Sequence, residues 1–184
     1  MTLDEIRTKI AEEFPNIDMS EELNKCSFVQ HLIDNYNITP YYKCLAAYVK
    51  LFQPKRILEI GTCSGISTLC LAKYAEHVDT YDITDEHVDS YVLNHPKITF
   101  NLLKTPESVL DISPKGYDLV FVDIDHSGTY EPRIHFRLME EYKGIAFWDD
   151  VGMIEMKSFW NSIPANEKRM FMWNRFGFGM VEYK

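Results

Sequence analysis

Three aspartates stand where strand-like runs of the sequence end, and a histidine follows the first of them. Asp123 closes the apolar run "YDLVFVD", and His126 comes three residues later. Asp149 and Asp150 close a second run, "GIAFWDD". Carboxylates that share a small volume resist ionising together, so we expect a positive partner beside them. A divalent cation such as Mg²⁺ suits this role, and the alternative is that one aspartate caps the next helix while the other is solvated.

A second group of residues that could bind a ligand follows the first predicted strand. In "EIGTCSGIS", Gly61 and Gly65 permit a tight turn that leads into a helix whose amide groups face a ligand. Asp82 ends the next strand, 21 residues after Gly61, where a carboxylate can bind the hydroxyls of a ribose. The turn and Asp82 together favour an adenosine-type ligand over an ordinary strand-to-helix turn.

Alternating patterns predict the elements that position these residues. Strand-like runs occur at 56–60, 77–83, 97–103, 117–123 and 144–148. Helical patterns fall between them, at 66–75, 85–93, 106–112 and 130–142. This alternation predicts βαβ units, and the runs 169–173 and 178–183 predict a closing hairpin. We therefore expect an α/β fold with a Rossmann-like, doubly wound, mostly parallel seven-stranded sheet and a C-terminal antiparallel hairpin.

Helices are predicted ahead of the sheet. Thr2 and Glu5 have the spacing of a capping box, residues 20–36 form a second helical pattern, and Thr39 with Pro40 resembles the start of a third. Within the sheet region, Thr84 and Thr105 are expected to cap the helices that follow them. We expect a single domain, 1–184, with an N-terminal helical region, 1–53, and a Rossmann-like core, 54–184.

Composition narrows the class of partner. The net charge of −9 weighs against nucleic acid and favours a small molecule. No apolar run is long enough to cross a bilayer, and the N-terminus lacks the core of a signal peptide. The four cysteines have neither metal-finger nor CxxC spacing, so we expect reduced thiols in a cytoplasmic protein that does not bind membranes. A homodimer is left open.

The stretch "ILEIGTCSGISTLCLA" with the later "YDI" resembles motifs I and II of class I S-adenosylmethionine-dependent methyltransferases. Over residues 39–182 it is most similar to the small O-methyltransferases of the catechol and caffeoyl-CoA type. The resemblance implies that Asp82 binds the ribose, that Ile83 contacts the adenine and that Lys104 and Thr105 lie at the adenine edge. It implies a full set of cofactor-binding residues: Glu59, Gly61, Thr62, Cys63, Gly65, Ser67, Asp82, Ile83, Lys104, Thr105 and Asp123.

The same resemblance implies a divalent cation, Mg²⁺ or Ca²⁺, held by Asp123, Asp149 and Asp150. Related enzymes usually carry Asn where this chain has Asp150, and the catechol-type enzymes carry a lysine where it has His126. An imidazole titrates near neutral pH, so His126 is a candidate base, with a loop residue as the alternative. We therefore assign catalysis to Asp123 and His126, whereas Tyr41, Tyr42 and "FWNS" (159–162) receive no role.

The resulting hypothesis is a cation-assisted O-methyltransferase that acts on a small hydroxylated acceptor. One alternative is a metal-independent methyltransferase acting on O or N through His126 or a carboxylate. A second is a domain that binds the adenosyl ligand without catalysis. A nicotinamide-dependent reductase of the short-chain type would need a YxxxK pair, and none of the eleven tyrosines has a lysine four residues on.

Overall fold

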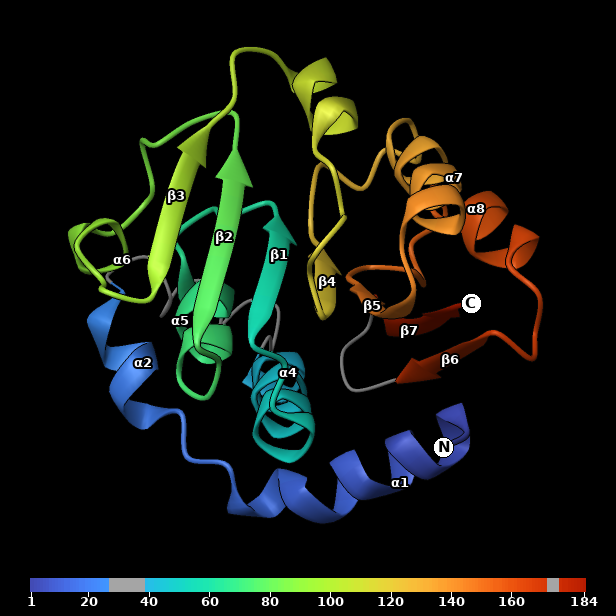
Figure 1. Cartoon of the computed structure of the whole chain (residues 1–184), viewed down its shortest axis with the longest axis horizontal. Helices are drawn as coiled ribbons and strands as arrows, with labels where there is room; N and C mark the ends of the chain where they lie inside the picture. The colour runs from blue at the N-terminus through green and yellow to red at the C-terminus, as the bar shows by residue number, and fades with distance from the viewer. Residues whose placement is uncertain (27–38, 172–175) are drawn as a thin grey trace.

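A twisted sheet forms the centre of the structure, a computed structural model that describes residues 1–26, 39–171 and 176–184 (Figure 1). Its seven strands are β1 (Arg56–Ile60), β2 (His77–Asp82), β3 (Ile98–Leu102), β4 (Leu119–Val122), β5 (Gly144–Trp148), β6 (Lys168–Phe171) and β7 (Phe178–Tyr183). Their order is β3-β2-β1-β4-β5-β7-β6. Strands β1 to β5 are parallel to one another, whereas β7 is antiparallel to both β5 and β6. The predicted fold class is confirmed.

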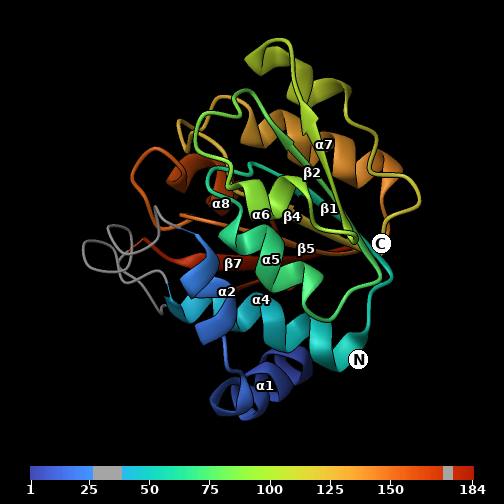
Figure 2. The ribbon, with the colours of Figure 1, turned by 90° about the vertical axis from the view of Figure 1, so that its left-hand side faces the viewer.

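Helices cover both faces of the sheet (Figure 2). They are α1 (Leu3–Glu13), α2 (Ser20–Lys25), α4 (Thr39–Phe52), α5 (Ile66–Ala72), α6 (Ser90–Leu93), α7 (Glu131–Glu141) and α8 (Lys157–Ser162), with 3₁₀ turns η1 (Phe14–Asn16) and η2 (Pro106–Asp111). Helices α1, α4 and α5 lie on one face, and α7 and α8 lie on the other.

The central strands are apolar on both sides because each side faces its own core. In β4, Phe121 packs into the core beneath α4 and α5, whereas Val120 and Val122 pack into the core beneath α7 and α8. Strand β5 repeats the pattern with Phe147 on one side and Trp148 on the other, and all five side chains are buried. This burial explains the continuous apolar runs in the sequence.

Most predicted boundaries agree with the structure, and the capping box at the start of α1 is present. The Thr2 hydroxyl accepts a hydrogen bond from the Glu5 amide at 3.3 Å, and the Glu5 carboxylate accepts one from the Thr2 amide at 2.8 Å. Helix α4 begins at the predicted Thr-Pro pair. The second predicted helix is seen as α2, and the rest of its range, 27–36, lies outside the described residues.

Two predicted caps are wrong. Asp89 rather than Thr84 caps α6, because its carboxylate accepts the Tyr91 amide at 2.9 Å, and the Thr84 hydroxyl serves a turn instead by accepting the Glu86 amide. Thr105 precedes the predicted Pro106, but its side chain makes no capping hydrogen bond and the segment is a 3₁₀ turn rather than an α-helix.

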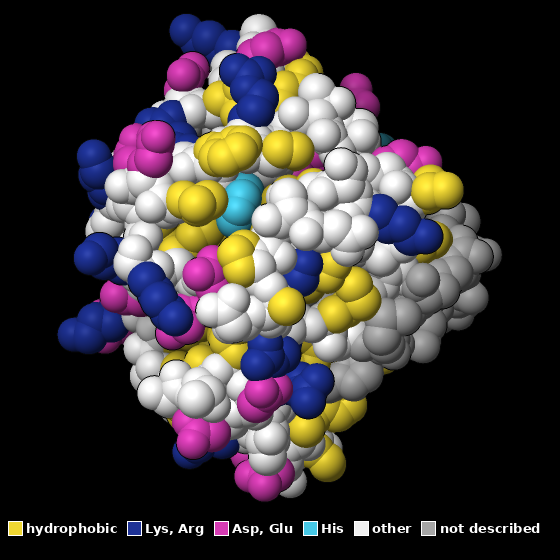
Figure 3. Space-filling model, turned by 90° about the vertical axis from the view of Figure 1, so that its right-hand side faces the viewer, with side chains coloured by type: hydrophobic (Ala, Val, Ile, Leu, Met, Phe, Trp, Pro, Cys, Tyr) yellow, Lys and Arg dark blue, Asp and Glu magenta, His cyan; other side chains and the backbone are white. Residues whose placement is uncertain are grey.

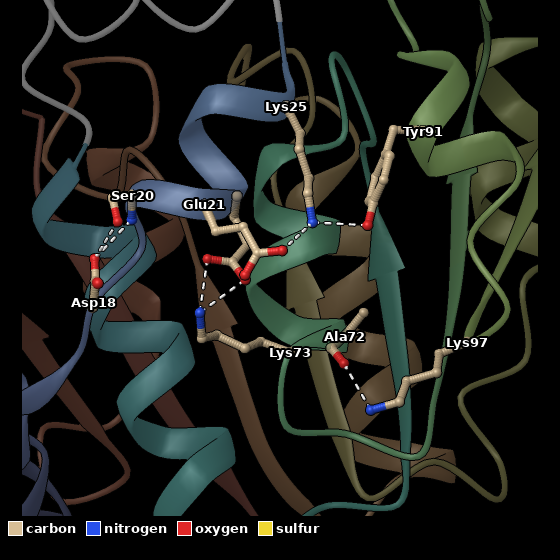
Figure 4. Close-up of polar contacts among 9 residues, drawn as sticks. Asp18, Ser20, Glu21, Lys25, Ala72, Lys73, Tyr91 and Lys97 are labelled. Carbon is tan, nitrogen blue, oxygen red and sulfur yellow. Dashed lines mark hydrogen bonds and ion pairs between the residues drawn. The ribbon is translucent and has the colours of Figure 1, made fainter.

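Ionic contacts attach α2 to the sheet region (Figure 4). Lys73, just after α5, donates to both carboxylate oxygens of Glu22 at 2.8 and 2.9 Å. Lys25 donates to Glu21 and to the hydroxyl of Tyr91 on α6, each at 2.7 Å. These contacts hold the end of α2 beside the turn that follows β1, where the Cys26 thiol lies 3.7 Å from the Ser64 carbonyl oxygen.

Basic, acidic and hydrophobic side chains are interspersed on the surface that Figure 3 shows. This view faces the side of α8 and β6, and it presents no continuous basic area. Among the described residues, the helices are too short or too polar to traverse a lipid bilayer.

We predict that Lys73→Ala lowers the free energy of unfolding by about 2 kcal/mol, because Glu22, only 7% exposed, would lose its cationic partner. Urea unfolding measures the change. The control is Lys115→Ala, whose ammonium lies 3.6 Å from Glu141 and is 70% exposed, for which we expect at most about 0.5 kcal/mol. Equal losses in the two variants would contradict the prediction.

Candidate functional site

A cavity of about 750 Å³ opens where β1, β2, β4 and β5 end. In a parallel sheet of this kind, ligands bind beyond the carboxyl ends of the strands. On one side the cavity is lined by the turn after β1 and by Asp82, and on the other by Asp123, His126 and the residues that follow β5. The two groups of residues predicted from the sequence therefore border a single space.

The turn after β1 requires glycine at both of its predicted positions. Gly61 has a φ of 102°, and a Cβ atom there would lie 1.7 Å from the carbonyl oxygen of Asp123. Gly65 has a φ of 86° and begins α5, and a Cβ there would lie 2.4 Å from a methyl group of Val92. Glycine thus allows the turn to approach β4 and α6 without a clash.

Asp82 fixes the conformation of this turn. One carboxylate oxygen, Oδ2, accepts the amides of Thr62 and Cys63, each at 2.8 Å. The other, Oδ1, accepts the amide of Ile83 at 2.7 Å and that of Thr84 at 3.3 Å. Asp82 also lines the cavity, as predicted for a residue that binds a ribose, so the same carboxylate shapes the turn and faces the ligand space.

Glu59 lies behind the turn rather than in the cavity wall. It is 0% exposed, and the Thr68 hydroxyl donates to its Oε2 at 2.5 Å, whereas Oε1 has no hydrogen-bond partner among the described residues. Burial raises the pKa of Glu59 to about 7, although hydrogen bonds from Ser67, Thr68 and Thr80 lower it. Glu59 therefore supports the turn, and its predicted contact with a ligand stays a prediction.

The remaining predicted cofactor residues divide into two groups. Thr62, Cys63, Ser67 and Ile83 line the cavity. Lys104 and Thr105 are exposed and do not line it; Leu103, Pro106 and Val109 do so instead. The segment that follows β3 therefore contributes apolar side chains to the cavity, whereas its polar pair, Lys104 and Thr105, is exposed.

The three predicted metal ligands converge at the opposite wall, with His126 between two of them. The Nε2 atom of His126 lies 3.3 Å from Oδ1 of Asp123 and 3.5 Å from Oδ2 of Asp150. Asp149 is 6% exposed, and its Oδ1 has no hydrogen-bond partner among the described residues. Burial and the charges of Asp123 and Asp150 raise the pKa of Asp149 well above its usual range.

His126 is held as a cation by its neighbours. Burial alone would lower the pKa of the imidazole, but the carboxylates of Asp123, Asp150 and Asp149 outweigh it and raise the pKa to about 9. The ring is therefore protonated near neutral pH, so it can donate hydrogen bonds and offset negative charge. A base needs the neutral form of the ring, so the role of His126 as a base stays a prediction.

The arrangement does not fit the predicted cation. Among residues 1–26, 39–171 and 176–184, no group of three or more His, Cys, Asp or Glu side chains is arranged to hold a metal ion. The charges of Asp123 and Asp150 already face His126, and Asp149 is buried beside them. The three carboxylates predicted as ligands thus lie close together, but two of them contact the His126 side chain.

The sequence analysis missed an aromatic wall of the cavity. Tyr41 and Tyr42, in the first turn of α4, line it together with Met153 and Phe176. The Tyr41 hydroxyl donates to Oδ2 of Asp123 at 3.5 Å. No motif marks these residues; the only signal was the Thr-Pro helix start, which places an aromatic pair at the end of α4 nearest the cavity. Phe159 and Trp160 of α8, by contrast, pack into the core on the other face of the sheet.

The fold is that of the class I S-adenosylmethionine-dependent methyltransferases. An O-methyltransferase from Bacillus cereus, solved with S-adenosylhomocysteine, has a TM-score of 0.70 and 19% identity, covering 97% of this chain and 100% of that one. An O-methyltransferase of tomaymycin synthesis from Streptomyces achromogenes, solved with S-adenosylmethionine, has a TM-score of 0.70 and 16% identity, covering 97% and 96%.

A third similar structure is a putative caffeoyl-CoA O-methyltransferase from Staphylococcus aureus, with a TM-score of 0.65 and 14% identity, covering 90% of this chain and 97% of that one. No protein-family model matches the sequence, and neither does any curated protein. At these identities the similarity is one of fold, and function must be argued from the site.

We predict that Glu59→Gln flattens the pH dependence of stability. With its folded pKa raised to about 7, native Glu59 keeps a proton that the unfolded chain has lost, so stability falls as pH rises from the ordinary value of 4.5 through 7. A glutamine lacks this penalty, which amounts to roughly 3 kcal/mol. Urea unfolding at pH 5 and pH 8 measures it, and parallel profiles of the wild type and the variant would refute the assignment.

Proposed function

We propose that the protein is an S-adenosylmethionine-dependent methyltransferase that methylates a hydroxyl group of a small acceptor. The observation that carries the proposal is the single cavity with two unlike walls, one formed by the glycine turn and Asp82, the other by aromatic residues and carboxylates. Two substrates that bound against these walls would meet beside Asp123. The similar structures named as O-methyltransferases and solved with S-adenosylmethionine or S-adenosylhomocysteine support the same proposal.

The donor would occupy the wall formed by β1, β2 and η2. Asp82 would bind the ribose hydroxyls, and the turn 61–65 would receive the methionine portion. The adenine would pack against Ile83, which is 51% exposed at the edge of the cavity, and against Leu103 and Pro106. An exposed isoleucine at this position is explained by such a contact, because apolar surface there would be buried when the ligand binds.

The acceptor would lie against Tyr41, Tyr42, Met153 and Phe176 with its hydroxyl toward Asp123. Its oxygen would attack the methyl carbon, the carbon–sulfur bond would break with its electron pair going to sulfur, and the sulfonium would become a neutral thioether. The hydroxyl proton would pass to the carboxylate of Asp123, because His126 is already protonated near neutral pH. His126 would hold that carboxylate in position through its 3.3 Å contact. The chief contribution of the site is to align the two reactants.

The cation-assisted form of this reaction, with Mg²⁺ or Ca²⁺ at Asp123, Asp149 and Asp150, is the hypothesis that the sequence resemblance supports. A bound cation would lower the pKa of the acceptor hydroxyl. Because the donor set is not arranged to hold a cation, we assign no step to it. The metal-independent form has a specific observation in its favour, namely the contact of one imidazole nitrogen with two carboxylates.

Calorimetry with S-adenosylhomocysteine tests the proposal. We expect the wild type to bind, and Asp82→Ala to weaken binding at least about tenfold, because the ribose would lose its charged hydrogen-bond acceptor and the turn its anchor. The matched control is Asp85→Ala, an exposed aspartate three residues on that does not line the cavity, with affinity expected to be unchanged. Circular dichroism verifies folding. Absence of binding to the wild type would refute the proposed function.

A further inference from the structure

The acidic wall of the cavity brings three carboxylates close to one histidine. Asp123, Asp149 and Asp150 lie together there, and no Lys or Arg from the described part of the chain lines the cavity. His126 is the basic side chain that reaches this cluster, with one ring nitrogen within ion-pair distance of two carboxylates. The side chains of these residues are 14–22% exposed, so water screens their interaction only in part.

Both residues of the contact between His126 and Asp150 have a backbone conformation that residues other than glycine rarely adopt. His126 has a φ of 54° and Asp150 a φ of 52°, both in the left-handed region. Each such residue costs on the order of 1–3 kcal/mol and persists only where surrounding structure compensates. The two strained positions are the partners of the 3.5 Å contact between His126 and Asp150, which is such a compensation.

Each carboxylate oxygen of Asp123 already has one side-chain contact. His126 lies 3.3 Å from Oδ1, and the hydroxyl of Tyr41 donates to Oδ2 at 3.5 Å. Mg²⁺ needs its oxygen ligands at about 2.0–2.1 Å in near-ideal octahedral geometry. A cation that bound between Asp123 and Asp150 would therefore compete with the His126 ring for the same carboxylates.

We propose that His126 takes the place of a divalent cation in this protein, its imidazole ring bridging Asp123 and Asp150 so that the site works without a metal. The inference rests on the proposed methyl transfer and specifies the acceptor. A chelated cation favours acceptors with two adjacent oxygens, whereas an acceptor oriented by side chains needs one hydroxyl. The acceptor class is therefore a compound with a single reactive hydroxyl and an apolar or aromatic body, which suits the wall of Tyr41, Tyr42 and Phe176.

The test compares the effect of Mg²⁺ on the melting temperature of the wild type and of His126→Asn, after dialysis against EDTA. Asparagine tolerates the left-handed backbone but is too short to bridge the carboxylates. We expect millimolar MgCl₂ to leave the wild type unchanged at matched ionic strength. We expect His126→Asn to melt roughly 5 °C lower, because Asp123 and Asp150 have lost the side chain that contacts both, and MgCl₂ to restore most of that loss. CaCl₂ is the second probe.

Should His126→Asn fail to fold, a double variant that combines His126→Asn with Asp150→Asn replaces it in the same comparison. It keeps an oxygen-bearing side chain at each of the positions 123, 149 and 150 but carries one negative charge fewer. The matched control is His135→Asn, a histidine on α7 that pairs with Tyr183 and does not line the cavity; Mg²⁺ should not stabilise it. The inference is overturned if Mg²⁺ or Ca²⁺ raises the melting temperature of the wild type. It is also overturned if neither cation raises the melting temperature of the variants at position 126. Binding of S-adenosylhomocysteine to the same samples separates this outcome from failure of the proposed function.

Discussion

The close approach of β1 and β4 at their carboxyl ends is the constraint on which the cavity depends. The Gly61 amide donates to Tyr81 of β2 at 2.8 Å, and the Asp123 amide donates to Ile60 of β1 at 2.8 Å. Gly61 thereby lies against the Asp123 carbonyl, at a distance that excludes any Cβ atom. A side chain at position 61 would push the glycine turn away from the acidic wall, so one missing methyl group keeps the two halves of the site together.

Each acid at this sheet edge is stabilised in a different way, and these differences give the residues different chemistry. Backbone amides surround Asp82 and donate to both of its carboxylate oxygens. A histidine and a tyrosine engage Asp123. Glu59 and Asp149 are buried, each with one oxygen that has no hydrogen-bond partner in the part of the chain that the structure describes, and burial raises the pKa of both. Proximity in the sequence motifs therefore does not imply a shared role.

The fold and the location of the site were predictable from sequence because their signals are local. Alternating apolar runs mark strands buried on both faces, and the glycines and strand-ending aspartates mark the carboxyl edge. The direction in which a side chain points was not predictable. Lys104 turns to solvent, Glu59 lies behind the turn, and the Asp123–His126 contact depends on a backbone torsion at position 126 that no motif encodes. Tyr41 was missed because its partner is 82 residues away.

The insertion of β7 between β5 and β6 sets an order of events during synthesis. Strand β6 precedes β7 in the chain, yet among the described strands its partner is β7, so its pairing in the sheet waits for residues 178–183 to be synthesised. Until then one edge of β5 is also open, with Phe147 and Trp148 on the strand that bears Asp149 at its end. A chain whose residues 178–183 are not yet paired therefore leaves the backbone of β5 open to pairing with another molecule.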